Sequence, residues 1–424
     1  MRLEYKRYIS AVLLLLCGAM FFVATSAHGE RLEFLQESVP KQSRISLKHF
    51  NHLFAPIRPG NRKMAVVNIY SEYPDYSFAI EPAEGFACVD DVARAIVMLA
   101  EHVKIQPDKD VLRKIKMLVE FILHMQNDNG YFNNFIWPDL SINTQYKTSV
   151  AEMNWWSLRA LWSLETAHEL FLSDADLTNR IEKAIEKVVI RIKRDLAAPD
   201  FKTVAINGIE VATWLPNKYA ADQAAVAIIA LLPYYKRSAD AGIPAIINAL
   251  ALGIMKMQKG NADNYPYGMF LSWKNEWHAW GNNQAYALLL AGQQLERPEY
   301  IQSALREVDH FYPFLMKNGF PGSISIKYEA GLYSRASGKM FPQIAYGIRP
   351  MVYAVSEAYR VTKNKKYAVQ LAKLKSWFLG GNIAGKFMYD QKSGRTYDAI
   401  VSATEINLNS GAESTIEGLM VLQR

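Results

Sequence analysis

The chain has 424 residues and a formal net charge of +7, and half of its residues are hydrophobic. Its basic residues are spread along the chain and form no stripe, which argues against a nucleic-acid partner. A chain of this length can bury a large core and needs no disulfide to fold. Only Cys17 and Cys88 are present, and only Cys88 lies beyond the N-terminal segment described next.

Residues 1–29 have the pattern of a signal peptide. Arg2, Lys6 and Arg7 precede an apolar run over residues 11–24, which is too short to span a bilayer, and small residues follow it. We therefore expect cleavage of this segment, an extracytoplasmic location (secreted or periplasmic) and a single mature domain over residues 30–424. No later stretch has the length of a membrane helix, so we expect no integral membrane association.

Aromatic residues are abundant, at 12% of the chain with nine Trp and 23 Tyr. Several of them stand in predicted loops, such as residues 70–76, 265–267 and 273–280. Planar side chains beside polar groups suit the apolar faces of sugar rings, although core packing accounts for most large aromatic side chains. Aromatic side chains in the loops are therefore candidates for contact with a carbohydrate partner.

One structural unit repeats six times along the chain. Each copy opens with small residues and a polar residue or pair, followed by a strongly apolar helix. The openings are marked by Asp90, Glu152, Asp222, Asn283, Gly347 and Glu413, at intervals of 62, 70, 61, 64 and 66 residues. A recurring interval indicates one supersecondary unit copied along the chain.

A second, amphipathic helix follows in each copy, with apolar residues three and four positions apart. These helices are predicted at residues 111–126, 178–196, 242–259, 298–318 and 366–379, and residues 46–53 should supply the sixth. The apolar helices would form an inner ring and the amphipathic ones an outer ring. The predicted fold is an all-α (α/α)6 toroid of six helical hairpins. Short strand-like insertions at residues 64–70 and 396–403 would lie at one face, where the six loops that precede the inner helices meet.

The segment Gly-Phe-Ala-Cys-Val-Asp90-Asp91-Val-Ala-Arg94-Ala and the terminal segment Asn409-Ser-Gly-Ala-Glu413-Ser-Thr, set on six hairpins, resemble the six-hairpin glycosidase superfamily. That superfamily contains glycoside hydrolases and some polysaccharide lyases. The resemblance covers essentially the whole mature chain in its architecture. Its members often pair an aspartate early in the chain with a glutamate near the end, which implies Asp90 or Asp91 together with Glu413.

The chemistry of the residues directs attention to the same positions. Glycoside hydrolysis needs one carboxyl group to protonate the leaving oxygen and a second to activate water or attack carbon. Acids at helix starts also cap backbone N–H groups, and Asp90 and Arg94 have the i,i+4 spacing of an intrahelical ion pair. Two adjacent acids are harder to explain by capping alone, and repulsion between them raises one pKa toward the range that is useful for a general acid. We rank Asp90 and Asp91 first, and Glu413 second, as catalytic residues.

Other polar and aromatic residues at the helix starts and in the loops are expected to bind substrate. They are Arg94, Glu152, Asn154, Trp155, Trp214, Asp222, Trp277, His278, Asn283 and Arg349. A single His between tryptophans, such as His278, is more often packed than catalytic. Because the chain has no zinc-ligand spacing and no phosphate-binding glycine loop, we expect no metal and no cofactor.

Three functions fit these observations. The preferred one is a secreted glycoside hydrolase that cleaves an oligo- or polysaccharide with a carboxylate pair. The second is a polysaccharide lyase or epimerase acting on uronate polymers, in which Arg94, Arg349 or Lys147 would neutralise the substrate carboxylate. The third is a non-catalytic carbohydrate-binding protein of the cell envelope, whose acids only cap helices. The repeat by itself does not choose among them.

Overall fold

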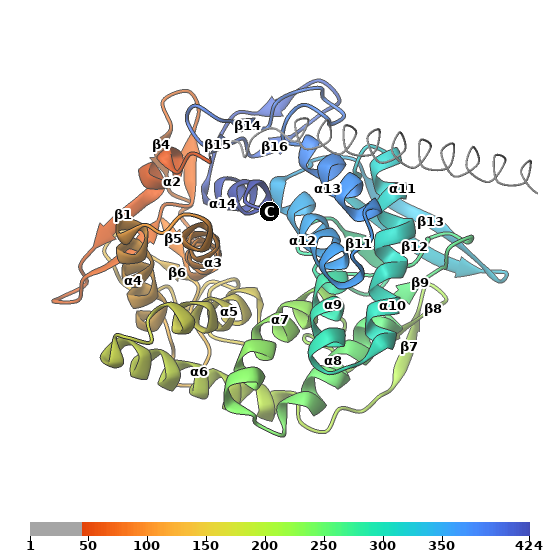
Figure 1. The fold of residues 1–424 in the computed structure, drawn as a ribbon, viewed down its shortest axis with the longest axis horizontal. Coiled ribbons are helices and arrows are strands. Elements are labelled where there is room, and N and C mark those ends of the chain that lie inside the picture. Colours follow the sequence, from red (N-terminus) through yellow and green to blue (C-terminus); the bar gives the residue numbers. More distant parts are fainter. Residues whose placement is uncertain (1–44) are drawn as a thin grey trace, which may run out of the picture. The chain divides into compact units, whose positions relative to one another are not determined.

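The computed structural model describes residues 45–424, so the predicted signal peptide and the first residues of the predicted mature domain lie outside the described residues (Figure 1). Six inner helices are α3 (Val89–Ile105), α5 (Trp155–Leu170), α7 (Ala221–Ser238), α9 (Gln284–Gln294), α12 (Ala345–Thr362) and α14 (Ala412–Leu422). Each inner helix contacts the next, and α14 contacts α3. The six helices therefore close into a ring.

An outer helix packs on each inner one. The outer helices are α4 (Lys109–His124), α6 (Ala175–Asp195), α8 (Ile243–Lys256), α10 (Pro298–Arg306), α13 (Lys366–Ser376) and α2 (Lys48–Leu53). Helix α10 continues through residues 307–317, which are described below. The predicted all-α toroid of six hairpins is confirmed. The short helix α2 packs on α14, so the two ends of the described chain complete the sixth hairpin.

Burial differs between the two rings as the sequence pattern predicts. In α7 every residue from Ala221 to Leu232 is buried, and its many alanines allow neighbouring helices to approach closely. In α6 the buried residues recur at three- and four-residue spacing, from Leu177 through Ile181 to Ile192. An inner helix is enclosed on all sides, whereas an outer helix buries one stripe and leaves the opposite face to solvent.

The fourth outer helix is interrupted where the sequence predicted a continuous one. A π-helical turn, η1 (Glu307–Phe311), separates α10 from α11 (Tyr312–Lys317). Pro313 supplies the physical reason, because proline has no N–H to donate and its ring crowds the carbonyl group four residues before it. A wider turn relieves that crowding while the helix continues in the same direction.

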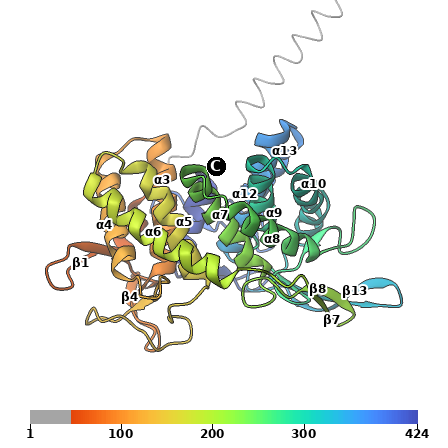
Figure 2. The same cartoon turned by 90° about the horizontal axis from the view of Figure 1, so that it is seen from below.

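Short antiparallel strand pairs fill the connections. They are β1 (Phe54–Ile57) with β2 (Met64–Val67), β3 (Tyr70–Glu72) with β4 (Ser77–Ala79), β5 (Ala87–Cys88) with β6 (Phe135–Ile136), β7 (Thr203–Ile206) with β8 (Ile209–Ala212), β9 (Gln258–Lys259) with β10 (Met269–Phe270), β11 (Glu276–His278) with β12 (Ser323–Glu329) and β13 (Leu332–Lys339), β14 (Tyr389–Asp390) with β15 (Arg395–Thr396), and β16 (Ala399–Ile400) with β17 (Ile406–Asn407). Figure 2 shows β1, β4, β7, β8 and β13 on one side of the helices. The predicted strand-like insertions are thus present, and the loops before the inner helices gather at one face. None of the helices within residues 45–424 is both long and apolar enough to cross a membrane.

Candidate functional site

The buried guanidinium of Arg94 joins the carboxyl groups that the sequence singled out. Its Nη1 lies 2.6 Å from Asp91 Oδ1, and its Nη2 lies 2.8 Å from Glu413 Oε2 and 3.1 Å from Asp90 Oδ2. The two bonded oxygens, Asp91 Oδ1 and Glu413 Oε2, are joined by two hydrogen bonds and the width of one guanidinium group. They therefore lie at most about 8 Å apart. The structure therefore brings the predicted residues together from opposite ends of the chain.

The two adjacent aspartates occupy different environments. The side chains of Asp90 and Glu413 are 18% and 40% exposed, whereas that of Asp91 is 5% exposed. Asp91 also accepts a contact from the Cys88 thiol at 3.3 Å. Because Asp90 and Glu413 share Nη2 of Arg94, their nearest oxygens lie within about 6 Å of each other. The accessible carboxyl pair is thus Asp90 with Glu413, and Asp91 lies behind them.

Protonation also separates the two members of this accessible pair. Burial raises the pKa of Glu413 to about 7, even though Arg94 acts in the opposite direction. Burial acts to raise the pKa of Asp90 too, but the guanidiniums of Arg159 and Arg94 outweigh it and hold that pKa below its usual value. Neighbouring carboxyl groups whose pKa values are driven apart can serve as an acid and an anion in one reaction.

Arg159 and Tyr346 belong to the site although the sequence did not single them out. Arg159 binds both carboxylate oxygens of Asp90 through Nη1 and the Tyr346 hydroxyl through Nη2. The Tyr346 ring lies 4.8 to 5.3 Å from the guanidinium carbons of Arg94, Arg159 and Arg349. A usable signal was present, because Arg94, Arg159 and Arg349 each stand five or six residues after the N-cap of an apolar helix, where a charge needs a buried partner.

Polar contacts connect the inner helices around the toroid, with His278 of β11 standing between α7 and α9, and form what we term the polar ring. Its contacts are Asp90 with Arg159, Asn154 with Gln223 (3.1 Å), Asp222 with His278 (3.1 Å), Asn283 with Arg349 (2.7 Å), Arg349 with Glu417 (2.6 Å) and Glu413 with Arg94 (2.8 Å). Glu417, also unpredicted, is fully buried, and its Oε1 lies 3.2 Å from Nε of Arg94. The repeat therefore assembles a single polar centre.

Some of the predicted binding residues serve this centre from within. Arg349 is 1% exposed, and its Nε and Nη1 are bonded to Glu417 and Asn283, so both predicted residues are interior parts of the polar ring. Glu152 was expected at a helix start, but α5 begins three residues later at Trp155, and the exposed Glu152 carboxylate accepts a bond from the N-cap residue Asn154 at 2.9 Å.

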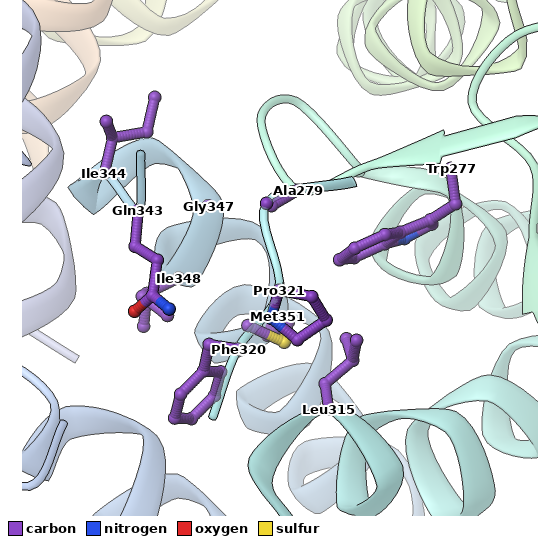
Figure 3. A pocket seen from close by; sticks show the side chains of 11 residues that line it. Trp277, Ala279, Leu315, Phe320, Pro321, Gln343, Ile344, Gly347, Ile348 and Met351 are labelled. Carbon is purple, nitrogen blue, oxygen red and sulfur yellow. The ribbon is translucent and has the colours of Figure 1, made fainter. Parts of the chain in front are cut away.

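The predicted tryptophans lie in different places. Trp155 is half-buried, 5.0 Å from the Arg159 guanidinium. Trp214 donates to the Ala249 carbonyl of outer helix α8 at 2.9 Å, so it packs in the outer wall. Trp277 is 2% exposed and lines a small apolar pocket beside the start of α12 (Figure 3). Packing encloses Trp277, whereas Trp214 is half-buried against α8, and substrate binding by these two residues stays a prediction.

Within residues 45–424, no group of three or more His, Cys, Asp or Glu side chains is arranged to hold a metal ion. The side chains of Asp90 and Glu413 can themselves take part in acid–base chemistry.

Comparisons with known proteins place the fold in the (α/α)6 class. The sequence matches no family model and no curated protein. The structure is similar to a sugar epimerase from a ruminal bacterium, with a TM-score of 0.62 and 9% identity over 93% of this chain and 98% of that one. It is also similar to cellobiose 2-epimerase from Spirochaeta thermophila (TM-score 0.60, 11% identity, 93% and 97% covered). A glycosyl hydrolase of family 88 from Bacteroides vulgatus follows (TM-score 0.52, 10% identity, 78% and 90% covered). At these identities the similarity shows a shared fold.

Proposed function

We propose that this chain is a carbohydrate-active enzyme, and specifically a glycoside hydrolase that uses Glu413 as its general acid and Asp90 as the anionic partner. The observation that carries the proposal is the accessible carboxyl pair bridged by Arg94, with a raised pKa on one member and a lowered pKa on the other. Glycosidases use two carboxyl groups in these two protonation states.

In the proposed reaction, Glu413 transfers its proton to the glycosidic oxygen as the bond to the anomeric carbon breaks. Asp90 remains ionised and stabilises the positive charge that develops on the sugar ring. Water then supplies a hydroxyl to the anomeric carbon and returns one proton to Glu413. Arg94 holds both carboxyl groups in place, and Arg159 keeps Asp90 anionic.

The non-catalytic alternative requires that these acids act as helix caps. Among the described residues, however, the N-cap of α3 is Cys88, and the side chains of Asp90 and Glu413 bond to arginines. Helix α14 has no side-chain cap at all. The capping explanation therefore loses its basis at these two positions.

An epimerase or isomerase is the second candidate, because two of the structures that resemble this chain are named as sugar epimerases. In that reaction an acid–base group removes and returns a proton at a sugar carbon. The uronate form of this hypothesis needs free cationic groups, yet Arg94 and Arg349 are already bonded to carboxylates of the chain. The exposed Lys147 would remain for that role.

The test uses a panel of oligo- and polysaccharides incubated in D2O and followed by reducing-end assay and proton NMR. A hydrolase produces new reducing ends with no deuterium on carbon. An epimerase produces an altered sugar of the same length that carries solvent deuterium. Turnover should fall at least 100-fold in Glu413→Gln and Asp90→Asn, the loss expected for a missing acid–base group. The exposed Glu405→Gln serves as the matched control and should keep full activity. Near-normal activity in both site variants would refute the carboxyl pair.

We also propose that the enzyme acts outside the cytoplasm, on the basis of the signal-peptide pattern in residues 1–29. N-terminal sequencing of the protein recovered from a periplasmic or culture fraction should give a start between residues 25 and 30. A mature product that retains Met1 in the cytoplasm would contradict this location.

A further inference from the structure

The loop before α9 contains an aromatic residue that neither the fold nor the carboxyl pair requires. We infer that Trp280 is the stacking platform for an uncharged sugar ring beside the polar ring. This inference rests on the proposed function and names the kind of substrate and the residue that receives it.

The geometry of Trp280 is that of a supported platform. Its ring lies parallel to the imidazole of His278, with a centroid separation of 4.2 Å and an interplanar angle of 10°. Trp280 nevertheless remains 44% exposed. Because His278 covers one face of the indole, the exposed area must come from the opposite face and the ring edges. A flat aromatic face open to solvent is the surface on which the C–H face of a sugar packs.

His278 is itself fixed from both sides. Its Nδ1 lies 2.8 Å from the Trp280 carbonyl oxygen, and its Nε2 lies 3.1 Å from Asp222 Oδ2. A carbonyl oxygen only accepts, so Nδ1 is the donor in the first contact, and Nε2 faces the Asp222 carboxyl group. The backbone N–H of His278 is also held, by Ser272 Oγ at 3.1 Å.

These contacts explain what the Asp222–His278 pair does. Both nitrogens of the imidazole lie against groups of the protein, which fixes the orientation of the ring. It serves as a rigid support that fixes the plane of Trp280 before any ligand arrives. A platform held in its binding geometry in advance loses less entropy when a ligand binds.

Gly281 places this platform beside the reactive centre. A Cβ atom at Gly281 would lie 2.8 Å from both Trp155 Cη2 and the Tyr346 hydroxyl, and its φ of +71° also favours glycine. Tyr346 is bonded to Arg159, which in turn binds Asp90. The backbone that follows Trp280 therefore lies close to Tyr346, whose hydroxyl is bonded to Arg159.

The charges of the site favour a neutral ligand. The guanidiniums of Arg94, Arg159 and Arg349 are each bonded to a carboxylate of the chain. The groups with exposed area at this centre are instead the carboxyl oxygens of Glu413 and Asp90. Carboxyl oxygens accept hydrogen bonds from sugar hydroxyls, whereas an acidic sugar brought against the anionic Asp90 meets repulsion.

Equilibrium binding to the Glu413→Gln protein tests the inference without turnover. Calorimetry with cellotetraose, mannotetraose and trigalacturonate as probes should show binding of at least one neutral probe and at least tenfold weaker binding of trigalacturonate. Adding Trp280→Ala should weaken the neutral probe at least tenfold, while Trp280→Phe, which keeps an aromatic face, should stay within threefold. Trp273→Ala is the matched control, because Trp273 is 39% exposed but has Lys274 Nζ over its ring at 3.9 Å. It should also stay within threefold.

Two results would overturn the inference: failure of both neutral probes to bind, or unchanged affinity in Trp280→Ala. Preferred binding of trigalacturonate would overturn the uncharged class of ligand. Failure of the proposed hydrolysis is distinguishable, because it would appear as absent turnover in the unmutated chain while Trp280-dependent binding persists.

Discussion

Glu307 provides a quantitative test of how burial controls protonation in this fold. Its side chain on η1 is fully buried, and Oε1 accepts the Phe270 N–H at 2.8 Å. Among the described residues no cationic side chain acts on its charge; the Phe270 N–H and the Tyr312 hydroxyl are the polar groups beside it. Burial therefore raises the pKa of Glu307 to about 8, from 4.5 for the unfolded chain. We predict that Glu307→Gln removes most of the resulting pH dependence of stability.

The sign and size follow from proton linkage. Between about pH 4.5 and pH 8 the folded protein holds a proton that the unfolded chain has released, so folding stability falls as pH rises through this window. Each pH unit in the window lowers the free energy of unfolding by about 1.4 kcal/mol, and the loss from pH 4.5 to pH 7 is about 3 kcal/mol. Glutamine keeps an acceptor for Phe270 and has no proton to lose. It also adds N–H donors that need a partner, at a constant cost of about 1 to 2 kcal/mol.

Urea unfolding at pH 5, 6, 7 and 8 measures this difference directly. The stability of Glu307→Gln relative to the unmutated protein should rise with pH, by about 3.5 kcal/mol from pH 5 to pH 8, whatever the constant offset. Glu299→Gln on α10 serves as control, since Glu299 is partly exposed and bonded to Arg297, and its difference should stay within about 0.5 kcal/mol. Parallel pH profiles for Glu307→Gln and the unmutated protein would refute the assignment of a buried, protonated carboxyl group.

The remaining predictions concern the site and its support. If Glu413 donates a proton, kcat/KM should fall as pH rises through about 7, because the acid form is then lost, and a rate that keeps rising above pH 8 would contradict this role. The acid limb should lie below the usual pKa of an aspartate, because Asp90 must be ionised, and an acid limb near pH 6 would argue against it. Arg349→Met leaves Glu417 buried with part of its charge uncompensated, so urea unfolding should show a loss of about 3 to 5 kcal/mol. Gly281→Ala adds a methyl group where 2.8 Å is available and should lower stability by about 1 to 3 kcal/mol, whereas an unchanged melting temperature would mean that the mouth is loosely packed.

The toroid was predictable because its determinants are local and repeated. Apolar residues on all faces of one helix and on a single stripe of the next specify which helix is enclosed and which faces solvent. Six copies of that pair leave a closed ring as the arrangement that buries every apolar face. The π turn in the fourth outer helix was missed, although Pro313 lies next to it. Proline is found both in the first turn of a new helix and just after a bulge within a helix, and the sequence does not distinguish these two cases.

The carboxyl pair was predicted as a group, but its membership depended on tertiary contacts. Asp90 and Asp91 are adjacent in sequence, and successive helix residues point in directions about 100° apart. One therefore faces Arg159 on the next inner helix, while the other is enclosed by Arg94 and Cys88. No sequence interval gives the identity of a neighbour across the ring. The sequence itself determines that polar residues stand at the starts of the inner helices. Only closure of the ring determines which carboxyl group is exposed, which arginine binds it and whether it is protonated. The reason is that a pKa depends on desolvation and on charges within a few ångströms.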